Sequence, residues 1–170
     1  MGMDVYGTRE DTYFRNNIWG WRPLWNYVNE TCDLSDEDFN MGLLNNSHFI
    51  SKKKSDEISK ILFEEVKSKR THAYMLSRNK RLKSLPLEDC SYCNGTGTRT
   101  DIIDKGNGLD VSNKEIPYSN DCNGCNTERH KEKGLPLGKT EVWETHYHFD
   151  VDNVKTFAKF CKESDGFEIC

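Results

Sequence analysis

The sequence contains no long hydrophobic run, and no stretch approaches the roughly 20 consecutive apolar residues that a membrane-spanning helix needs. Residues 1–6 lack the basic and apolar regions of a secretory signal peptide. Tyr6 also stands where the myristoylation pattern requires Ser or Thr. From these absences we expect a cytoplasmic protein that neither spans a membrane nor is anchored to one.

Familiar catalytic and nucleotide-binding motifs are also missing. The sequence has no P-loop, no G-x-S-x-G, no H-E-x-x-H and no Rossmann glycine pattern. It has no internal repeat beyond two C-x-x-C pairs. An enzyme with an unrecognised site is therefore only a third hypothesis for the function, behind two non-catalytic ones.

Apolar residues are few for a globular protein. Hydrophobic residues make up 35% of the 170 residues, charged residues 31%, and the mean hydropathy is -0.85. Such a composition can indicate disorder. Four Trp, seven Tyr and eight Phe argue against disorder, because these large side chains can supply much of a modest core. We expect a single domain that spans residues 1–170.

Charge is unevenly distributed along the chain. The formal net charge is -4, yet the segment from Lys52 to Lys83 holds eleven Lys/Arg against four Asp/Glu. The overall acidity disfavours broad nucleic-acid binding, whereas the basic segment allows a local site. The simpler interpretation of that segment is a solvated helix face, and the alternative is a patch for phosphates or an acidic partner.

Periodicity in the sequence predicts both strands and helices. Residues 3–6 and 167–170 alternate as short strands do, and residues 142–149 are a further strand candidate. Pro23 is expected in the first turn of one helix, and Ser55 as the N-cap of another. The expected helices cover about 22–31, 55–66 and 71–85, and a final helix has its apolar stripe at residues 154–161 and ends at Gly166. Residues 33–47 are expected to form a surface loop.

Neither terminal strand could be stable alone, so we expect the two chain ends to meet in one small mixed sheet. Three to four helices would pack on one face of that sheet, which gives an α+β fold. A zinc-knuckle insert is expected over residues 88–130. Within it, residues 104–120 are rich in Gly, Asn and Ser and are expected to form an exposed loop.

Two C-x-x-C pairs, Cys90/Cys93 and Cys122/Cys125, predict a metal site. Each pair can occupy one side of a tetrahedral metal ion, and two pairs complete a closed four-cysteine zinc site. A closed site has no open coordination position, so it stabilises a fold and does not activate water. We expect one structural Zn2+. The alternatives are a redox dithiol and two buried pairs without metal.

Other potential ligands are weaker candidates. His130 follows the second pair and could replace one cysteine, but a surface histidine is the simpler interpretation. His146 and His148 would share one face of a strand and could bind a second metal, yet no third ligand has a recognisable spacing. The other cysteines are expected to be ordinary thiols, namely Cys32, Cys161 and Cys170.

An aromatic run near the N-terminus has two interpretations. Large aromatic residues can anchor a core, or they can stack on bases and ligand rings beside residues that bind phosphate or base edges. One sequence does not separate the two. The candidate residues for ligand or partner binding are Arg15, Asn17, Trp19, Trp21, Arg22 and Trp25.

Two resemblances follow from these segments. Residues 90–97 read C-x-x-C-x-G-x-G and resemble one repeat of the DnaJ cysteine-rich domain, which implies a zinc site. Over nearly its whole length the chain resembles an uncharacterised family of small bacteriophage and prophage proteins. The matching segments are residues 1–7, 13–25, 90–97, 122–125 and 166–170.

The second resemblance implies a phage-infected cytoplasm as the setting. The first hypothesis is then a non-enzymatic, zinc-stabilised phage accessory protein that binds and disables a host or defence component, either a protein or a nucleotide signal. The alternative is a nucleic-acid-binding regulator that uses the basic helices and the zinc knuckle.

Overall fold

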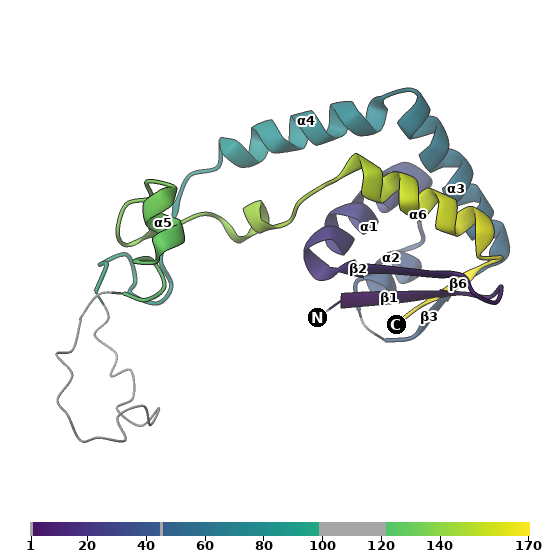
Figure 1. Cartoon of the computed structure of the whole chain (residues 1–170), viewed down its shortest axis with the longest axis horizontal. Coiled ribbons are helices and arrows are strands. Elements are labelled where there is room, and N and C mark those ends of the chain that lie inside the picture. Colours follow the sequence, from purple (N-terminus) through teal and green to yellow (C-terminus); the bar gives the residue numbers. More distant parts are fainter. Residues whose placement is uncertain (1, 45, 99–121) are drawn as a thin grey trace, which may run out of the picture. The chain divides into compact units, whose positions relative to one another are not determined.

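The computed structural model describes residues 2–44, 46–98 and 122–170, and the chain divides into two compact units (Figure 1). The first unit comprises Met1–Ser84 and Glu144–Cys170, and the second comprises Leu85–Trp143. The second unit extends beyond the expected insert at both ends. The loop expected at 104–120 lies outside the described residues. No described helix has the length and apolar character needed to cross a membrane.

The first unit contains a four-stranded antiparallel sheet that joins the two chain ends, as expected from the terminal segments. The strand order is β2 (Tyr13–Asn17), β1 (Gly2–Gly7), β6 (Phe167–Ile169) and β3 (His48–Ile50). Strand β6 pairs with both β1 and β3, so the C-terminal strand lies inside the sheet. All pairs are antiparallel, and the expectation of a mixed sheet is wrong.

Helices cover one face of this sheet (Figure 1). Helices α1 and α6 pack directly on the strands, α3 packs against both helices, and α4 packs against α3 and α6. A fifth helix, α2, packs against α1 and β3. Their bounds are α1 Ile18–Cys32, α2 Asp36–Gly42, α3 Lys52–Lys67, α4 Arg70–Lys83 and α6 Val151–Glu163.

Two tryptophans of α1 form the centre of the core. Trp21 and Trp25 are fully buried, and their stacked rings lie 5.2 Å apart. Each indole N–H donates to a backbone carbonyl of α2, from Trp21 to Gly42 over 2.7 Å and from Trp25 to Phe39 over 3.0 Å. Gly42 is required there, because a Cβ would lie 2.4 Å from the Trp25 ring.

The loop expected at 33–47 is therefore wrong, since α2 lies within it. Ser35 accepts a hydrogen bond from the Asp38 N–H and caps the helix, and three acidic residues occupy its first turn. Negative charge suits that end of the helix dipole. The polar composition of this segment did not indicate a helix, yet α2 forms there and its backbone carbonyls accept hydrogen bonds from two buried indoles.

Two helices begin earlier than expected. Asn17 caps α1 by accepting from the Gly20 N–H, so Pro23 lies inside the helix and not in its first turn. Ser51 caps α3, so Ser55 is not the N-cap. Ser55 is instead buried and donates to the Cys161 carbonyl of α6 over 2.8 Å. Such a small hydroxyl-bearing residue allows α3 and α6 to pack closely.

The strand expected at 142–149 is also wrong. A 3-10 helix, Trp143–His146, begins there instead. The aromatic residues beyond it make separate contacts: the Tyr147 ring lies 5.0 Å from Trp19, and the Phe149 ring lies 5.1 Å from Tyr27. The alternation in this segment reflects these individual contacts and not pairing with a neighbouring strand.

We expect Phe167→Ala to lower the free energy of unfolding by about 3–5 kcal/mol, the usual cost of removing a buried phenylalanine. Phe167 is fully buried in β6 and its ring contacts Phe157. Phe49→Ala on the neighbouring strand β3 is the control, because Phe49 is 58% exposed. Urea unfolding of both variants makes the comparison. Equal losses would contradict the placement of β6 in the core.

Candidate metal centre

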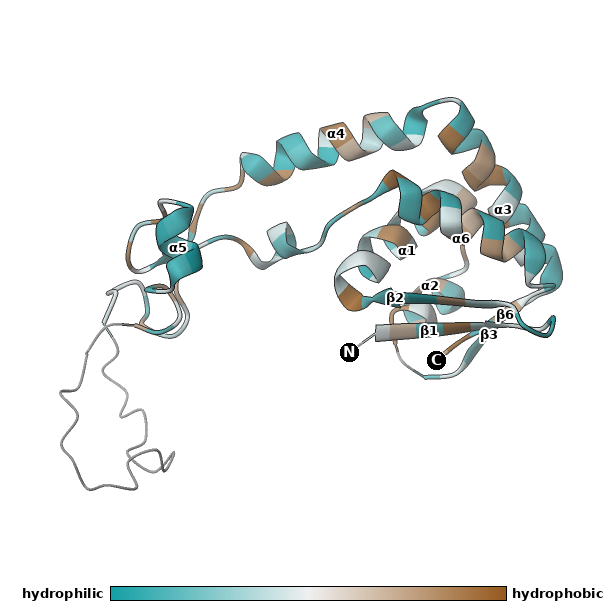
Figure 2. Ribbon diagram, viewed as in Figure 1, coloured by the Kyte–Doolittle hydropathy of each residue, from teal (hydrophilic) through white to brown (hydrophobic). Residues whose placement is uncertain are grey.

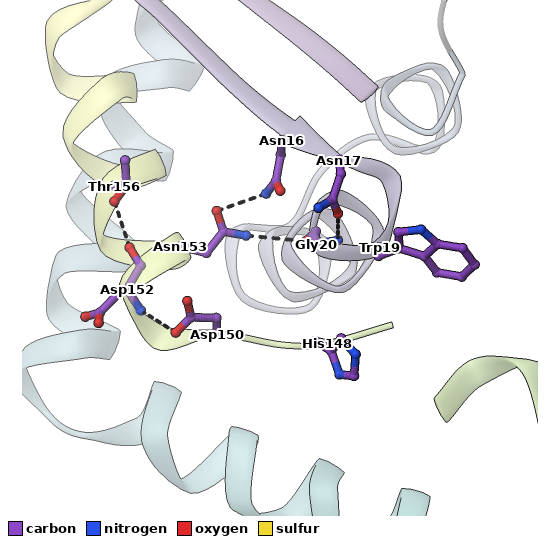
Figure 3. Close-up of a pocket in the computed structure, with 9 residues that line it drawn as sticks. All are labelled: Asn16, Asn17, Trp19, Gly20, His148, Asp150, Asp152, Asn153 and Thr156. Atoms are coloured by element: carbon purple, nitrogen blue, oxygen red, sulfur yellow. Dashed lines mark hydrogen bonds between the residues drawn. The ribbon is translucent and has the colours of Figure 1, made fainter. Parts of the chain in front are cut away.

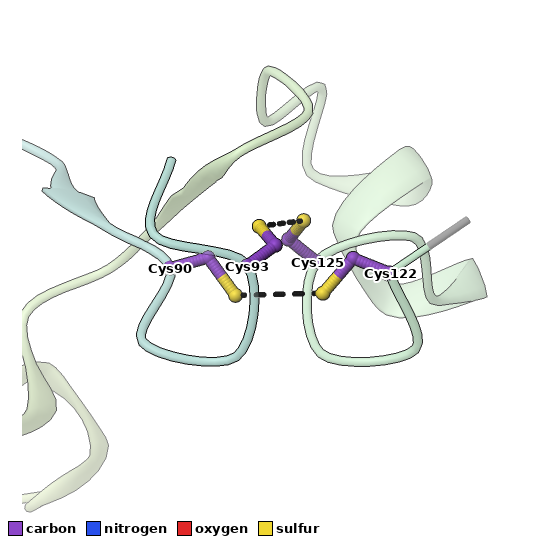
Figure 4. Close-up of side chains that lie close together, drawn as sticks. All are labelled: Cys90, Cys93, Cys122 and Cys125. Carbon is purple, nitrogen blue, oxygen red and sulfur yellow. Dashed lines mark hydrogen bonds between the residues drawn. The ribbon is translucent and has the colours of Figure 1, made fainter. Parts of the chain in front are cut away.

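The four cysteines of the two C-x-x-C pairs converge in the second unit (Figure 4). Cys90 and Cys93 follow strand β4 (Glu88–Asp89), which pairs with β5 (Lys139–Thr140). Cys122 and Cys125 precede the short helix α5 (Glu128–Glu132). All four side chains are buried and form a cluster of their own.

The distances between the sulfur atoms match tetrahedral metal coordination. Cys90 Sγ lies 3.7 Å from Cys122 Sγ, and Cys93 Sγ lies 3.8 Å from Cys125 Sγ. All four atoms lie within 4.8 Å of one another. A tetrahedron with Zn–S bonds of about 2.3 Å has sulfurs about 3.8 Å apart, whereas a disulfide requires about 2.05 Å. The group can therefore hold one metal ion such as zinc.

Backbone N–H groups point at three of these sulfurs. Gly97 N lies 3.3 Å from Cys93 Sγ, Gly124 N lies 3.3 Å from Cys122 Sγ, and Gly138 N lies 3.2 Å from Cys125 Sγ. Such donors stabilise negative charge on thiolates and orient them toward a metal. Of the two glycines that follow the first pair, Gly97 donates to a sulfur, whereas Gly95 N donates to the Cys90 carbonyl.

Gly138 is the residue of the site that the sequence did not reveal. It lies in a segment that reads as a linker, yet its carbonyl also accepts from the Cys90 N–H over 2.8 Å. Its φ is +82°, and a Cβ there would lie 2.0 Å from the Gly95 carbonyl oxygen. The sequence offered one indirect indication of this role. The second pair lacks the glycines that follow the first pair, so the N–H group that donates to Cys125 Sγ had to come from another segment.

The protonation of the thiols depends on their surroundings. Burial raises the pKa of Cys90 and raises the pKa of Cys125 to about 12. Burial opposes ionisation of Cys93 as well, but the Gly97 N–H and the neighbouring thiols lower its pKa to about 7. Ionisation is thus favoured at Cys93 and opposed at Cys90 and Cys125. A divalent cation reverses this opposition, because coordinated thiols lose their protons.

The other candidate ligands do not join this group. His130 lies in α5, where its Nδ1 is 2.8 Å from the Thr127 hydroxyl. Within the described residues, no second set of three or more His, Cys, Asp or Glu side chains lies close enough to hold a metal, which leaves His146 and His148 without such a set. Cys32 is buried in the first unit, and burial raises its pKa to about 11.

The candidate binding residues of the aromatic run are dispersed. Trp21 and Trp25 are buried, so the expectation that their rings form a binding surface is wrong, because α2 and α6 enclose them. Of the others, Arg15 and Asn17 have partners of their own, whereas Trp19 and Arg22 share Tyr147. Arg15 pairs with Asp4 at 3.5 Å, Asn17 caps α1, the Trp19 ring contacts Tyr147, and the Arg22 guanidinium donates to the Tyr147 hydroxyl over 3.2 Å.

A hollow of about 420 Å³ adjoins Asn17 and Trp19 (Figure 3). Its opposite side comes from the start of α6, which the sequence did not connect with the aromatic run. Asn153 anchors this side by accepting from the Asn16 amide over 2.9 Å. Asp150 and Asp152 line the hollow, and no Lys or Arg does, so it does not suit a nucleotide phosphate.

Comparison with known proteins gave no match to a family model, a curated protein or a solved structure. The interpretation of the site consequently depends on its geometry and chemistry.

We expect Gly138→Ala to abolish metal retention, because a Cβ would displace the Gly95 backbone and the Gly138 N–H that donates to Cys125 Sγ. Gly134→Ala is the matched control: Gly134 also has a positive φ of +65°, but nothing lies within 4 Å of its Cβ position. Metal content after challenge with a chelator distinguishes them. Equal retention in both variants would show that Gly138 is not part of the centre.

Proposed function

We propose that the chain is a non-enzymatic, zinc-stabilised accessory protein of a bacteriophage that binds and disables a host or defence component. The observation that carries the non-enzymatic assignment is the closure of the metal centre. Four sulfurs at tetrahedral spacing fill every coordination position of zinc, whereas a catalytic zinc keeps one position for water or substrate.

The folding role of zinc is supported by the composition of the second unit. In the part of this unit that the structure describes, the four cysteines are the only buried hydrophobic side chains. Helix α5 buries no residue at all. A metal therefore has to replace the missing apolar core, and structural zinc contributes folding free energy of about 10–16 kcal/mol in small zinc domains at neutral pH.

The phage setting is supported by the resemblance described above. It implies action in the cytoplasm of the host cell on a host protein, a defence protein or a nucleotide signal. A protein that disables its target simply by binding to it needs a stable surface and no reactive group. The partner is then expected to be retained in stoichiometric amounts and released unchanged.

We expect the purified protein to contain about one zinc per chain, and Cys93→Ser to lose the metal and to become thermally fragile or insoluble. Cys170→Ser is the control, since Cys170 belongs to the first unit and lies outside the four-sulfur group. Elemental analysis and thermal unfolding provide the measurements. Wild-type protein that is isolated without metal and is equally stable would refute the zinc assignment.

A second candidate function, nucleic-acid binding, is favoured by helix α4, whose residues are predominantly hydrophilic (Figure 2). The helix contains five Lys/Arg and no Asp or Glu. Arg70 and Arg81 are neutralised by Glu65 and Glu144. The remaining lysines of this segment, Lys69, Lys80 and Lys83, are exposed, and no ion pair involves them in the described part of the chain. With His72 and Leu76 they form a series in which each residue is three or four positions from the next, so all five lie along one face.

If α4 binds nucleic acid, we expect the affinity to fall steeply as the salt concentration rises. Three lysines on three phosphates give a slope of about 2.7 in a log–log plot for duplex DNA, so raising salt from 50 to 200 mM would weaken binding about 40-fold. Replacing Lys69, Lys80 and Lys83 by Gln should remove that dependence. The control variant replaces Lys53, Lys159 and Lys162, which are equally exposed elsewhere on the first unit. Equal binding by the two triple variants would exclude α4.

A further inference from the structure

The face of the sheet opposite the helices carries exposed aromatic side chains in one row. Because the register pairs Tyr13 with Tyr6, Tyr6 with Glu168, and Glu168 with Phe49, these four residues cross all four strands on the same face. Their neighbours in sequence, such as Val5 and Ile169, are buried beneath the helices. The row therefore lies on the face of the sheet opposite the one that the described helices α1 and α6 of the first unit cover (Figure 1).

The exposure of this row is unusual for aromatic residues. Tyr6 is 51% exposed, Tyr13 48% and Phe49 58%. The Tyr6 and Tyr13 rings contact each other at 5.2 Å between centroids. Contiguous exposed apolar surface of this kind marks interaction sites, and Tyr and Phe are enriched at the centres of protein interfaces.

Carboxylates lie among these rings. Glu168 stands between Tyr6 and Phe49 in the row, and the Ser47 hydroxyl donates to its Oε1. In the adjacent row, Asp4 accepts from the Tyr13 hydroxyl, which raises the pKa of Tyr13. No hydrogen bond or ion pair engages Glu168 Oε2 within the described residues. This oxygen can accept from an incoming donor.

These charges discriminate between two possible occupants. An aromatic sheet face can stack bases, but a nucleic-acid platform also needs cations for the phosphates. Here the basic residue opposite Asp4 is Arg15, which is paired with that carboxylate at 3.5 Å. Glu168 would repel a phosphate chain. A guanidinium placed over Glu168 would instead meet a carboxylate that is flanked by two exposed aromatic residues.

We propose that the outer face of the sheet is the docking surface for a partner protein, which presents an arginine side chain to Glu168 between Tyr6 and Phe49. This inference rests on the proposed binding function and specifies its partner: a protein with a basic surface. Tyr6, Tyr13 and Phe49 would form the apolar centre of the interface, and Glu168 would select the cation.

The test is a titration followed by NMR of the aromatic ring signals. The probe is the peptide acetyl-Gly-Arg-Gly-Arg-Gly-amide, compared with the same peptide carrying citrulline, which is neutral and nearly isosteric. We expect the arginine peptide to shift the ring signals of Tyr6, Tyr13 and Phe49, and the citrulline peptide to leave them unchanged. Equal shifts by both peptides, or none, would overturn the proposal. So would shifts produced by a thymidine hexanucleotide alone.

Matched variants make the assignment specific. We expect Glu168→Gln to weaken binding of the arginine peptide about fivefold, the effect of one exposed charge pair. Glu163→Gln removes an exposed carboxylate on α6 and should change nothing. Phe49→Thr should weaken binding similarly, whereas Phe63→Thr, an exposed aromatic on α3, should not. Equal affinities within either pair of variants would place the site elsewhere.

A separate measurement distinguishes failure of the proposed docking surface from failure of the proposed binding function. Wild-type protein and the Glu168→Gln variant are each used to capture proteins from infected-host lysate. We expect a stoichiometric partner with wild-type protein and a clearly reduced amount of it with the variant. A partner that both proteins retain equally would preserve the binding function but refute the sheet face.

Discussion

The convergence of four cysteine sulfurs is the constraint on which the second unit depends. Among its described residues these are the only buried hydrophobic side chains, so no conventional core holds its two knuckles together. Backbone N–H groups of three glycines donate to three of the four sulfurs, and all four sulfurs lie within 4.8 Å of one another. A zinc ion bound by all four sulfurs would have no open coordination position for a ligand.

The first unit, in contrast, is held together by a core of buried side chains. Its core is aromatic, and four buried polar side chains bond to backbone carbonyls: two indole N–H groups bond to carbonyls of α2, and Ser55 and Ser59 of α3 bond to carbonyls of α6. These pairings place all helices on one side of the sheet. The opposite side consequently keeps its outward-pointing aromatic side chains in contact with solvent.

The sequence was most informative where a single local pattern decides the outcome. The spacing of Cys90, Cys93, Cys122 and Cys125 predicted the four-sulfur group, and the short alternating chain ends predicted the sheet. It was least informative where partners lie far apart in the chain. Helix α2 and the role of Gly138 depend on contacts with Trp25 and Cys125, which periodicity does not encode. The exposed row on the sheet likewise depends on strand register.

The most direct test of the central claim is X-ray absorption spectroscopy of the purified protein at the zinc edge. The geometry of the site requires four sulfur neighbours at about 2.3 Å and no oxygen or nitrogen neighbour. Such a spectrum would establish a closed, non-catalytic metal centre. An oxygen or nitrogen in the coordination shell would contradict it, because an open or mixed site could activate water and the protein could then be an enzyme.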